Sequence, residues 1–156
     1  MMQQKSEQNE WDLKISKNFK LSEFIESETA SKRNIDNTPS DEIIENIKFL
    51  VTNLLQPIRD RISYPFHINS GYRCKELNDI IGGSTNSAHL QGLAADIDLG
   101  SKQLNRILWE EIERGHFNFD QVINENDFAW IHIGIKKNNV GNRLSMFKLH
   151  KKHQGC

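Results

Sequence analysis

A long stretch of helical periodicity is the feature that most constrains how this chain can fold. From about Ser40 to Arg61, apolar residues recur three and four positions apart and form one face: Ile43, Ile44, Ile47, Leu50, Val51, Leu54, Leu55 and Ile58. This spacing predicts one amphipathic helix. Pro39 or Ser40 suits its first position, and Pro57 predicts a kink or an end, because proline cannot donate the backbone hydrogen bond. Such a helix must bury its apolar face against other elements.

The rest of the chain alternates between strand patterns and two further helices. Strands are expected over 66–72, 93–99, 119–125, 128–135 and 144–149, the last at an edge of the sheet. One helix is expected over 75–81, ended by Gly82-Gly83, and another from a Ser101 cap to Gly115. The strands at 119–125 and 128–135 predict a hairpin with a turn at Asn126-Asp127. Together these elements predict an α+β fold, in which helices pack on a central, mainly antiparallel sheet.

Length and composition limit the class of protein. The 156 residues suit a single domain over 1–156, with an ordered core at about 19–148 and polar ends. A formal net charge of -1 predicts no attraction to nucleic acid, and no stretch reaches the roughly 20 apolar residues that cross a membrane. The polar start lacks a signal-peptide core, so we expect a protein that is cytoplasmic as made. In that compartment Cys74 and Cys156 are expected to be free thiols. We also expect a monomer.

One segment concentrates residues that suit a metal ion. His89 and Asp96 lie seven positions apart around Gly92, and His132 lies on a predicted strand further along the chain. A catalytic zinc site takes three such ligands and leaves a fourth position for water. The spacing alone also allows a bland interpretation, since a strand histidine is often simply packed and an aspartate after two alanines often caps a turn.

Several separated motifs resemble the zinc D-Ala-D-Ala carboxypeptidases and endopeptidases of the lysostaphin, D-Ala-D-Ala metallopeptidase and hedgehog superfamily. The resemblance runs from about Phe19 to Phe147. The motifs that carry it lie at 22–24, 36–39, 56–59, 70–73, 87–96, 119–125 and 130–132. It implies that His89, Asp96 and His132 hold one Zn²⁺ per chain.

The same resemblance implies roles for residues around the metal. Arg73 takes the position that meets a substrate carboxylate or peptide carbonyl, for which a planar guanidinium is suited. Ser87 takes a polar substrate-binding position, and Asn78 either binds substrate or braces its loop. Peptidoglycan stem or crosslink peptides are the implied substrates. Arg73 reading a terminal carboxylate favours a carboxypeptidase, whereas an open groove favours an endopeptidase.

The general base is the least certain residue of this site. Several branches of the superfamily carry an acid or histidine three residues before the last ligand, where this chain has Ala129. The most similar branch has a glutamate at the end of the preceding strand, which Glu125 matches. With a two-residue turn, however, Gln121 is opposite His132 and Glu125 lies four residues further along, roughly 13 Å away, which is too far unless the hairpin has a bulge or a longer loop.

Two other carboxylates therefore remain alternatives as the base. Asp120 is one, and Asp98 is the other or else a hydrogen-bond partner of a ligand histidine. The histidines outside the motifs are expected to be structural or exposed: His67, His116, His150 and His153.

The missing acid at Ala129 keeps a second class of function open. In that class the protein is a zinc-containing binding module of the same fold without peptidase activity. For the enzyme, small size and the absence of a signal segment fit a phage lysis protein that acts on the cell wall after release.

Overall fold

The computed structural model describes residues 11–149. The predicted loose ends, with His150, His153 and Cys156, lie outside this range. The described part begins with a small antiparallel hairpin of β1 (Lys14–Ser16) and β2 (Phe19–Lys20), followed by the 3-10 turn η1 (Leu21–Phe24) and helix α2 (Glu28–Lys32). This hairpin begins before Phe19, the start of the expected core, since β1 pairs with β2.

The predicted long helix is confirmed as one helical run with a widened middle. It comprises α3 (Asp41–Leu50), the π-helical segment η2 (Val51–Leu55) and α4 (Gln56–Arg61). The Ser40 side chain caps its start by accepting a hydrogen bond from the Ile43 amide. The helix continues through Pro57, which cannot donate a backbone hydrogen bond, because the wider π-helical turn lies directly before it. Such π-helical turns and prolines are common places for a helix to bend.

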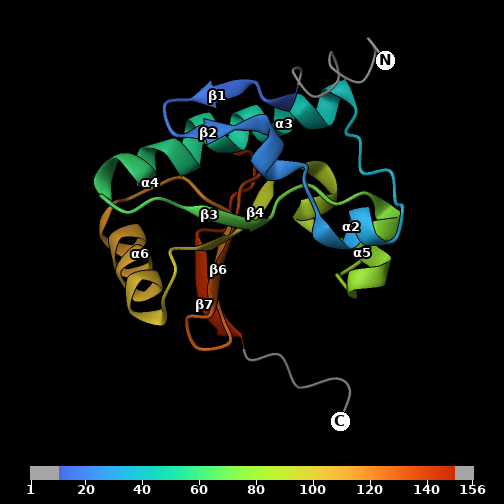
Figure 1. The fold of residues 1–156 in the computed structure, drawn as a ribbon. Coiled ribbons are helices and arrows are strands. Elements are labelled where there is room, and N and C mark those ends of the chain that lie inside the picture. The colour runs from blue at the N-terminus through green and yellow to red at the C-terminus, as the bar shows by residue number, and fades with distance from the viewer. Residues whose placement is uncertain (1–10, 150–156) are drawn as a thin grey trace.

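Five strands form the main sheet in the order β3-β4-β6-β5-β7 (Figure 1). Their bounds are β3 His67–Ser70, β4 Ala94–Asp98, β5 Gln121–Glu125, β6 Trp130–Gly134 and β7 Ser145–Leu149. All neighbouring pairs are antiparallel except β5 and β7, which run parallel. The predicted α+β fold with a mainly antiparallel sheet is confirmed, including β7 as an edge strand.

The two further helices lie where the glycines and caps predicted, and two short turns accompany them. These are α5 (Lys75–Ile81), α6 (Lys102–Arg114) and the short turns η3 (Ala88–Gln91) and η4 (Lys137–Asn139). Gly82 ends α5 with a left-handed φ of 82°, and Ser101 caps α6 at the Leu104 amide. None of the helices within 11–149 is long and apolar enough to cross a membrane.

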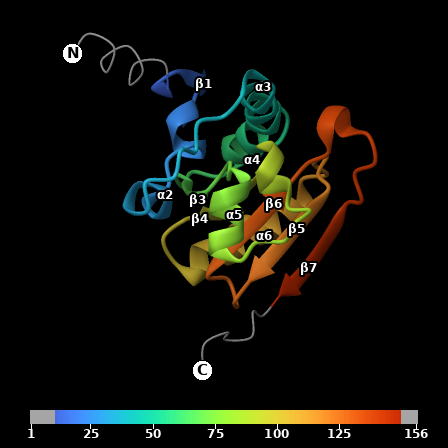
Figure 2. The same ribbon diagram turned by 90° about the vertical axis from the view of Figure 1, so that its right-hand side faces the viewer.

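The core occupies one face of the sheet. Figures 1 and 2 show α4 and α6 on one side of the strands and α2 and α5 on the other. Leu54 of the long helix, Leu108 of α6 and the strand residues Ile97, Ile131 and Ile133 belong to one buried cluster. Successive strand residues point to opposite faces, so Asp96 and His132, which alternate with these isoleucines, point to the other face.

The hairpin between β5 and β6 differs from its predicted form. Glu125 pairs with Trp130, so the connection has four residues instead of two. Three consecutive residues in it take left-handed φ values, Asn126 at 48°, Asp127 at 55° and Phe128 at 62°. The Ala129 amide then closes the turn on the Glu125 carbonyl at 3.0 Å. The predicted pairing of Gln121 with His132 is therefore wrong, and Ile123 takes that place.

Candidate metal centre

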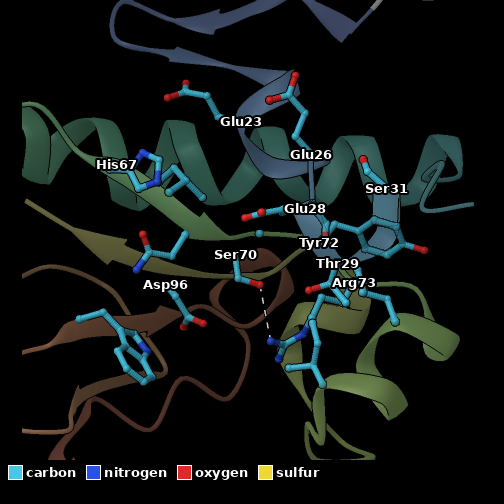
Figure 3. A pocket seen from close by; sticks show the side chains of 17 residues that line it. Glu23, Glu26, Glu28, Thr29, Ser31, His67, Ser70, Tyr72, Arg73 and Asp96 are labelled. Atoms are coloured by element: carbon cyan, nitrogen blue, oxygen red, sulfur yellow. Dashed lines mark hydrogen bonds between the residues drawn. The ribbon is translucent and has the colours of Figure 1, made fainter. Parts of the chain in front are cut away.

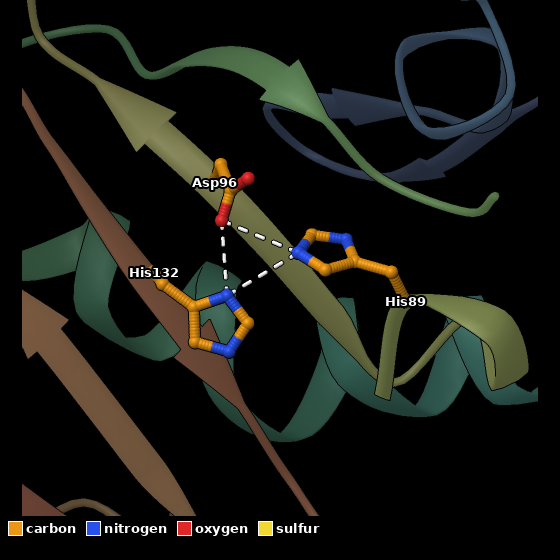
Figure 4. A group of neighbouring side chains, drawn as sticks. All are labelled: His89, Asp96 and His132. Carbon is orange, nitrogen blue, oxygen red and sulfur yellow. Dashed lines mark hydrogen bonds and ion pairs between the residues drawn. The ribbon is translucent and has the colours of Figure 1, made fainter. Parts of the chain in front are cut away.

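Strand pairing and one tight turn bring the three predicted ligands together. Asp96 and His132 are direct partners across β4 and β6, which places their side chains next to each other on one face. His89 lies in η3, and Gly92 turns the chain from η3 into β4 with a left-handed φ of 72°. Figure 4 shows the three side chains pointing toward one another.

The spacing of the donor atoms fits a single tetrahedral ion. Asp96 Oδ1 lies 2.9 Å from His132 Nδ1, His89 Nε2 lies 3.2 Å from that nitrogen, and His89 Nε2 lies 3.3 Å from Asp96 Oδ1. Ligands held ~2.0 Å from zinc at tetrahedral angles are about 3.3 Å apart. This group could therefore hold a metal ion, and three protein ligands leave one coordination position for another molecule.

A backbone carbonyl sets the tautomer of His89. His89 Nδ1 lies 2.7 Å from the Gly71 carbonyl oxygen, and because a carbonyl only accepts, the ring donates from Nδ1. The lone pair on Nε2 is then directed at the other two donors. Burial lowers the pKa of His89 more than nearby Asp96 raises it, which favours the neutral ring that a metal requires. Ligand histidines commonly donate their second N–H to a carbonyl in this way.

Gly71 can hold this carbonyl because it has no side chain. A Cβ at this position would lie 2.6 Å from the Cα and the carbonyl oxygen of Phe24. The adjacent Tyr72 amide donates to the same Phe24 carbonyl at 2.7 Å. The close approach between η1 and the end of β3 thus depends on glycine, and the orientation of His89 depends on that approach.

Asp96 presents a negative charge to this cluster. Burial raises the pKa of Asp96, but the facing His89 and His132 rings outweigh that effect and hold it well below its usual range. The carboxylate is therefore ionised at neutral pH. An anionic oxygen beside imidazole nitrogens is the donor set that suits a divalent transition-metal ion.

Arg73 lies beside the cluster in a groove of about 880 Å³ (Figure 3). Arg73 is 9% exposed. Within the described residues its side chain donates two long hydrogen bonds, from Nη1 to Ser70 Oγ at 3.5 Å and from Nη2 to Ser87 Oγ at 3.4 Å. Its Nε has no partner there. Burial lowers the pKa of Arg73 from an ordinary value so high that the guanidinium stays charged. Arg73 thus retains donors for a carbonyl or carboxylate in the groove.

The two other predicted substrate-binding residues have local roles. Ser87 caps η3 through its Oγ, which accepts from the His89 amide at 3.2 Å, and it also faces Arg73. Asn78 is 1% exposed and donates to the Ser84 carbonyl at 2.9 Å. Asn78 is not among the residues that line the groove, so its position fits the bracing role.

The corrected hairpin register moves Glu125 toward the metal centre. Glu125 is 6% exposed and shares the face of His132, because Glu125 pairs with Trp130 and Ile123 pairs with His132. Glu125 is thus two residues along the strand from the position opposite His132, about 7 Å away, rather than four. Glu125 is therefore closer to His132 than the two-residue turn would have placed it.

The two alternative carboxylates are held by other groups. Asp98 Oδ1 accepts from the Gly100 amide at 2.9 Å and from Asn105 Nδ2 at 3.0 Å, and neither partner is a ligand histidine. Asp120 binds Arg143 through both oxygens, at 2.9 and 2.8 Å. The hydrogen bonds from Arg143 lower the pKa of Asp120 although burial opposes them. These contacts tie both carboxylates to partners outside the group of His89, Asp96 and His132.

The other histidines and Cys74 lie apart from the three donors. His67 and His116 are exposed as expected, although His67 also lines the groove. Cys74 is a free, half-buried thiol. Sequence reasoning missed the role of Gly71 and the groove position of Trp130. Both residues lie within motifs, which was the available signal, but neither residue type by itself indicates a metal site.

The fold thus brings together three donors that could hold one metal ion and leave a coordination position open. The family model for peptidase M15 matches residues 17–134. The chain belongs to this family of peptidases, and the resemblance drawn from the separate motifs is confirmed. A comparison with curated protein sequences finds no match.

Proposed function

We propose that this protein is a zinc peptidase that hydrolyses peptide bonds of peptidoglycan, with His89, Asp96 and His132 as the ligands of one zinc ion. The observation that carries the proposal is the set of donor separations, 2.9, 3.2 and 3.3 Å, beside a groove that also contains Arg73. Membership of the peptidase M15 family supports the reaction class.

The residues around the donors supply the parts of a peptide hydrolysis. His89, Asp96 and His132 would hold a zinc ion, which would supply Lewis acidity to a coordinated water and to the peptide carbonyl. The Arg73 guanidinium binds the carbonyl or carboxylate oxygen of the peptide and stabilises the charge that develops on it. Glu125 accepts the proton of the attacking water and delivers it to the leaving amine. Its side chain is on the same face of the sheet as His132.

The extent of the groove favours a substrate longer than a dipeptide. The groove runs from Asp96 and Trp130 past Ser70 to Thr29 on α2, and its volume of about 880 Å³ is in the range that binds ligands of several residues. We therefore favour a cut inside a stem or crosslink peptide. Release of a terminal D-Ala is the other activity within the proposal, and Arg73 would then bind the terminal carboxylate.

The experiment is hydrolysis of purified stem and crosslinked peptides, with and without a chelator, read by mass spectrometry. We expect chelator-sensitive products, restored by zinc, whose masses identify the bond. If the protein binds zinc and the peptides but produces no fragment, it is a binding module, the alternative that Ala129 suggests.

A Glu125→Gln variant tests the assignment of the base. We expect kcat to fall by roughly 10²- to 10⁴-fold, the contribution of a positioned general base, while zinc affinity stays within about twofold. Glu110→Gln, which changes an exposed glutamate on α6, is the matched control and should behave as wild type. Full activity of Glu125→Gln would remove Glu125 from this role.

A further inference from the structure

The loop between β5 and β6 contains a strained segment that nothing within it explains. Asn126, Asp127 and Phe128 all have left-handed φ values, between 48° and 62°. Asparagine and aspartate tolerate this region, but it is a true outlier for a bulky residue such as phenylalanine. Strain of this kind persists only where surrounding contacts impose it, and it is concentrated at functional sites.

Asn105 of α6 supplies part of those contacts, beside Asn124 Oδ1, which accepts from the Phe128 amide at 2.6 Å. The Asn105 side chain is 0% exposed, and its Nδ2 donates to the Phe128 carbonyl at 2.9 Å and more weakly to the Ala129 carbonyl at 3.3 Å. The Phe128 ring is held by the same helix, with the Arg106 guanidinium 5.0 Å and the Trp109 ring 6.4 Å from its centroid. Helix α6 therefore fixes both the backbone and the side chain of this loop.

The same amide also holds the end of β4. Asn105 Oδ1 accepts from the Leu99 amide at 2.8 Å, and Nδ2 also contacts Asp98 Oδ1 at 3.0 Å. Asp98 is the last residue of the strand that carries Asp96. One buried side chain thus ties the strand of one metal donor to the loop that leads into the strand of another, His132.

The loop determines where Glu125 lies. With four residues in the loop, Ile123 is opposite His132 and Glu125 is two residues along the strand from that position. A shorter turn with Gln121 opposite His132 would move Glu125 roughly 7 Å further along the strand. The left-handed conformation of residues 126–128 is therefore the local condition for a glutamate close to the donors.

We infer that Asn105 is a positioning residue, which fixes the left-handed loop at 126–129 and thereby holds Glu125 in register with the metal centre. The inference rests on the proposed function in that Glu125 acts there as the base. Asn105 itself is buried behind the strands and does not contact the donor atoms or the groove. Its effect is on the position of Glu125 relative to His132 and the other two donor residues.

The test compares Asn105→Ala with Leu108→Ala on full-length protein. Leu108 lies on the same helix and is equally buried, but it is an apolar core residue, so its truncation destabilises the fold without removing a bond to the loop. Both variants are measured at a temperature where circular dichroism shows them folded. We expect kcat of Asn105→Ala on stem peptides to fall about 10- to 100-fold with KM within about twofold, as for residues that orient a catalytic group. Leu108→Ala should retain the wild-type kcat.

Hydrogen exchange of the amides at 124–132 provides a readout that does not depend on activity. Asn105→Ala should speed exchange at Phe128 and Ala129 at least about tenfold more than Leu108→Ala does, because these amides close the loop on Asn124 and Glu125. If wild type proves inactive, the proposed function fails while this measurement still decides whether Asn105 fixes the loop. Equal exchange in the two variants, or a wild-type kcat in folded Asn105→Ala, overturns the inference.

A second variant covers the case in which Asn105→Ala does not fold. Asn105→Asp keeps the size and the acceptor for Leu99 but lacks the donor to Phe128 and Ala129. It should show the same local loosening and the same loss of kcat. Normal loop exchange and kcat in Asn105→Asp would overturn the inference.

Discussion

Asp96 on β4 and Asp120 just before β5 are both carboxylates with little solvent exposure, and different partners surround them. The pKa of each is lowered although burial opposes the shift. Asp120 is paired through both oxygens with Arg143, a fixed cation that neutralises it. Asp96 instead shares one oxygen with two imidazoles, and His89 is kept neutral by burial. The difference shows that a lowered carboxylate pKa does not by itself distinguish a candidate metal donor from a carboxylate held in an ion pair, whereas the partners of the carboxylate do.

The largest expected effect comes from Asp96→Asn against Asp120→Asn. Asp96→Asn removes the only anionic donor, so activity should fall by more than about 100-fold, beyond the loss typical of outer partners of a metal site. Free zinc at about 1,000 times its Kd should stabilise wild type by about 4 kcal/mol and should not stabilise Asp96→Asn. Thermal unfolding with and without zinc measures this.

Asp120→Asn is the matched control for that change. It lowers stability but should keep the zinc-dependent rise and the wild-type kcat, because Asp120 contacts Arg143 and no metal donor. Loss of zinc binding in Asp120→Asn, or its retention in Asp96→Asn, would contradict the division of roles.

An intermediate effect is expected from Gly71→Ala, which should displace the backbone carbonyl that orients His89. The added Cβ would lie 2.6 Å from Phe24 backbone atoms, so β3 or η1 must move, at about 1–3 kcal/mol for overpacking. Zinc affinity should fall about 10- to 100-fold because the His89 partner is displaced. Chelator competition measures the affinity.

Gly82→Ala separates strain from orientation. Gly82 also has a constrained backbone, with φ of 82°, but a Cβ there meets nothing within 4 Å. It should cost about 1–2 kcal/mol of stability and leave zinc affinity unchanged. Equal zinc affinity in Gly71→Ala and wild type would show that the Gly71 carbonyl does not orient the ligand.

The smallest effect is expected from Arg143→Met, which tests the other carboxylate. Hydrogen bonds from Arg143 lower the folded-state pKa of Asp120 below its ordinary 3.8, so the pair stabilises the protein above that value and loses its effect as pH falls through the folded pKa. We expect a modest loss of stability at pH 7, because the Arg143 side chain is 55% exposed, and a smaller difference near pH 3. Urea unfolding at both pH values measures it, and a difference that grows toward acid would contradict the assignment.

The ligand residues and Glu125 differ in how far the sequence alone could predict them. The order of elements, the caps at Ser40 and Ser101 and the glycine end of α5 followed from local residue preferences. The ligand residues followed from the motifs. The position of Glu125 relative to the ligand residues did not follow, because the hairpin length depends on three left-handed residues, and no local preference predicts that conformation for Phe128.

The amino-acid sequence by itself determined which segments form helices and strands, which family the chain resembles and which three side chains are offered to a metal. These properties depend on neighbouring residues or on motif identity. The tertiary structure alone decided the register between β5 and β6, the Gly71 carbonyl behind His89 and the pairing of Asp120 with Arg143. Each of these joins residues far apart or fixes a strained loop through contacts with another element, and such contacts exist only once the chain has packed.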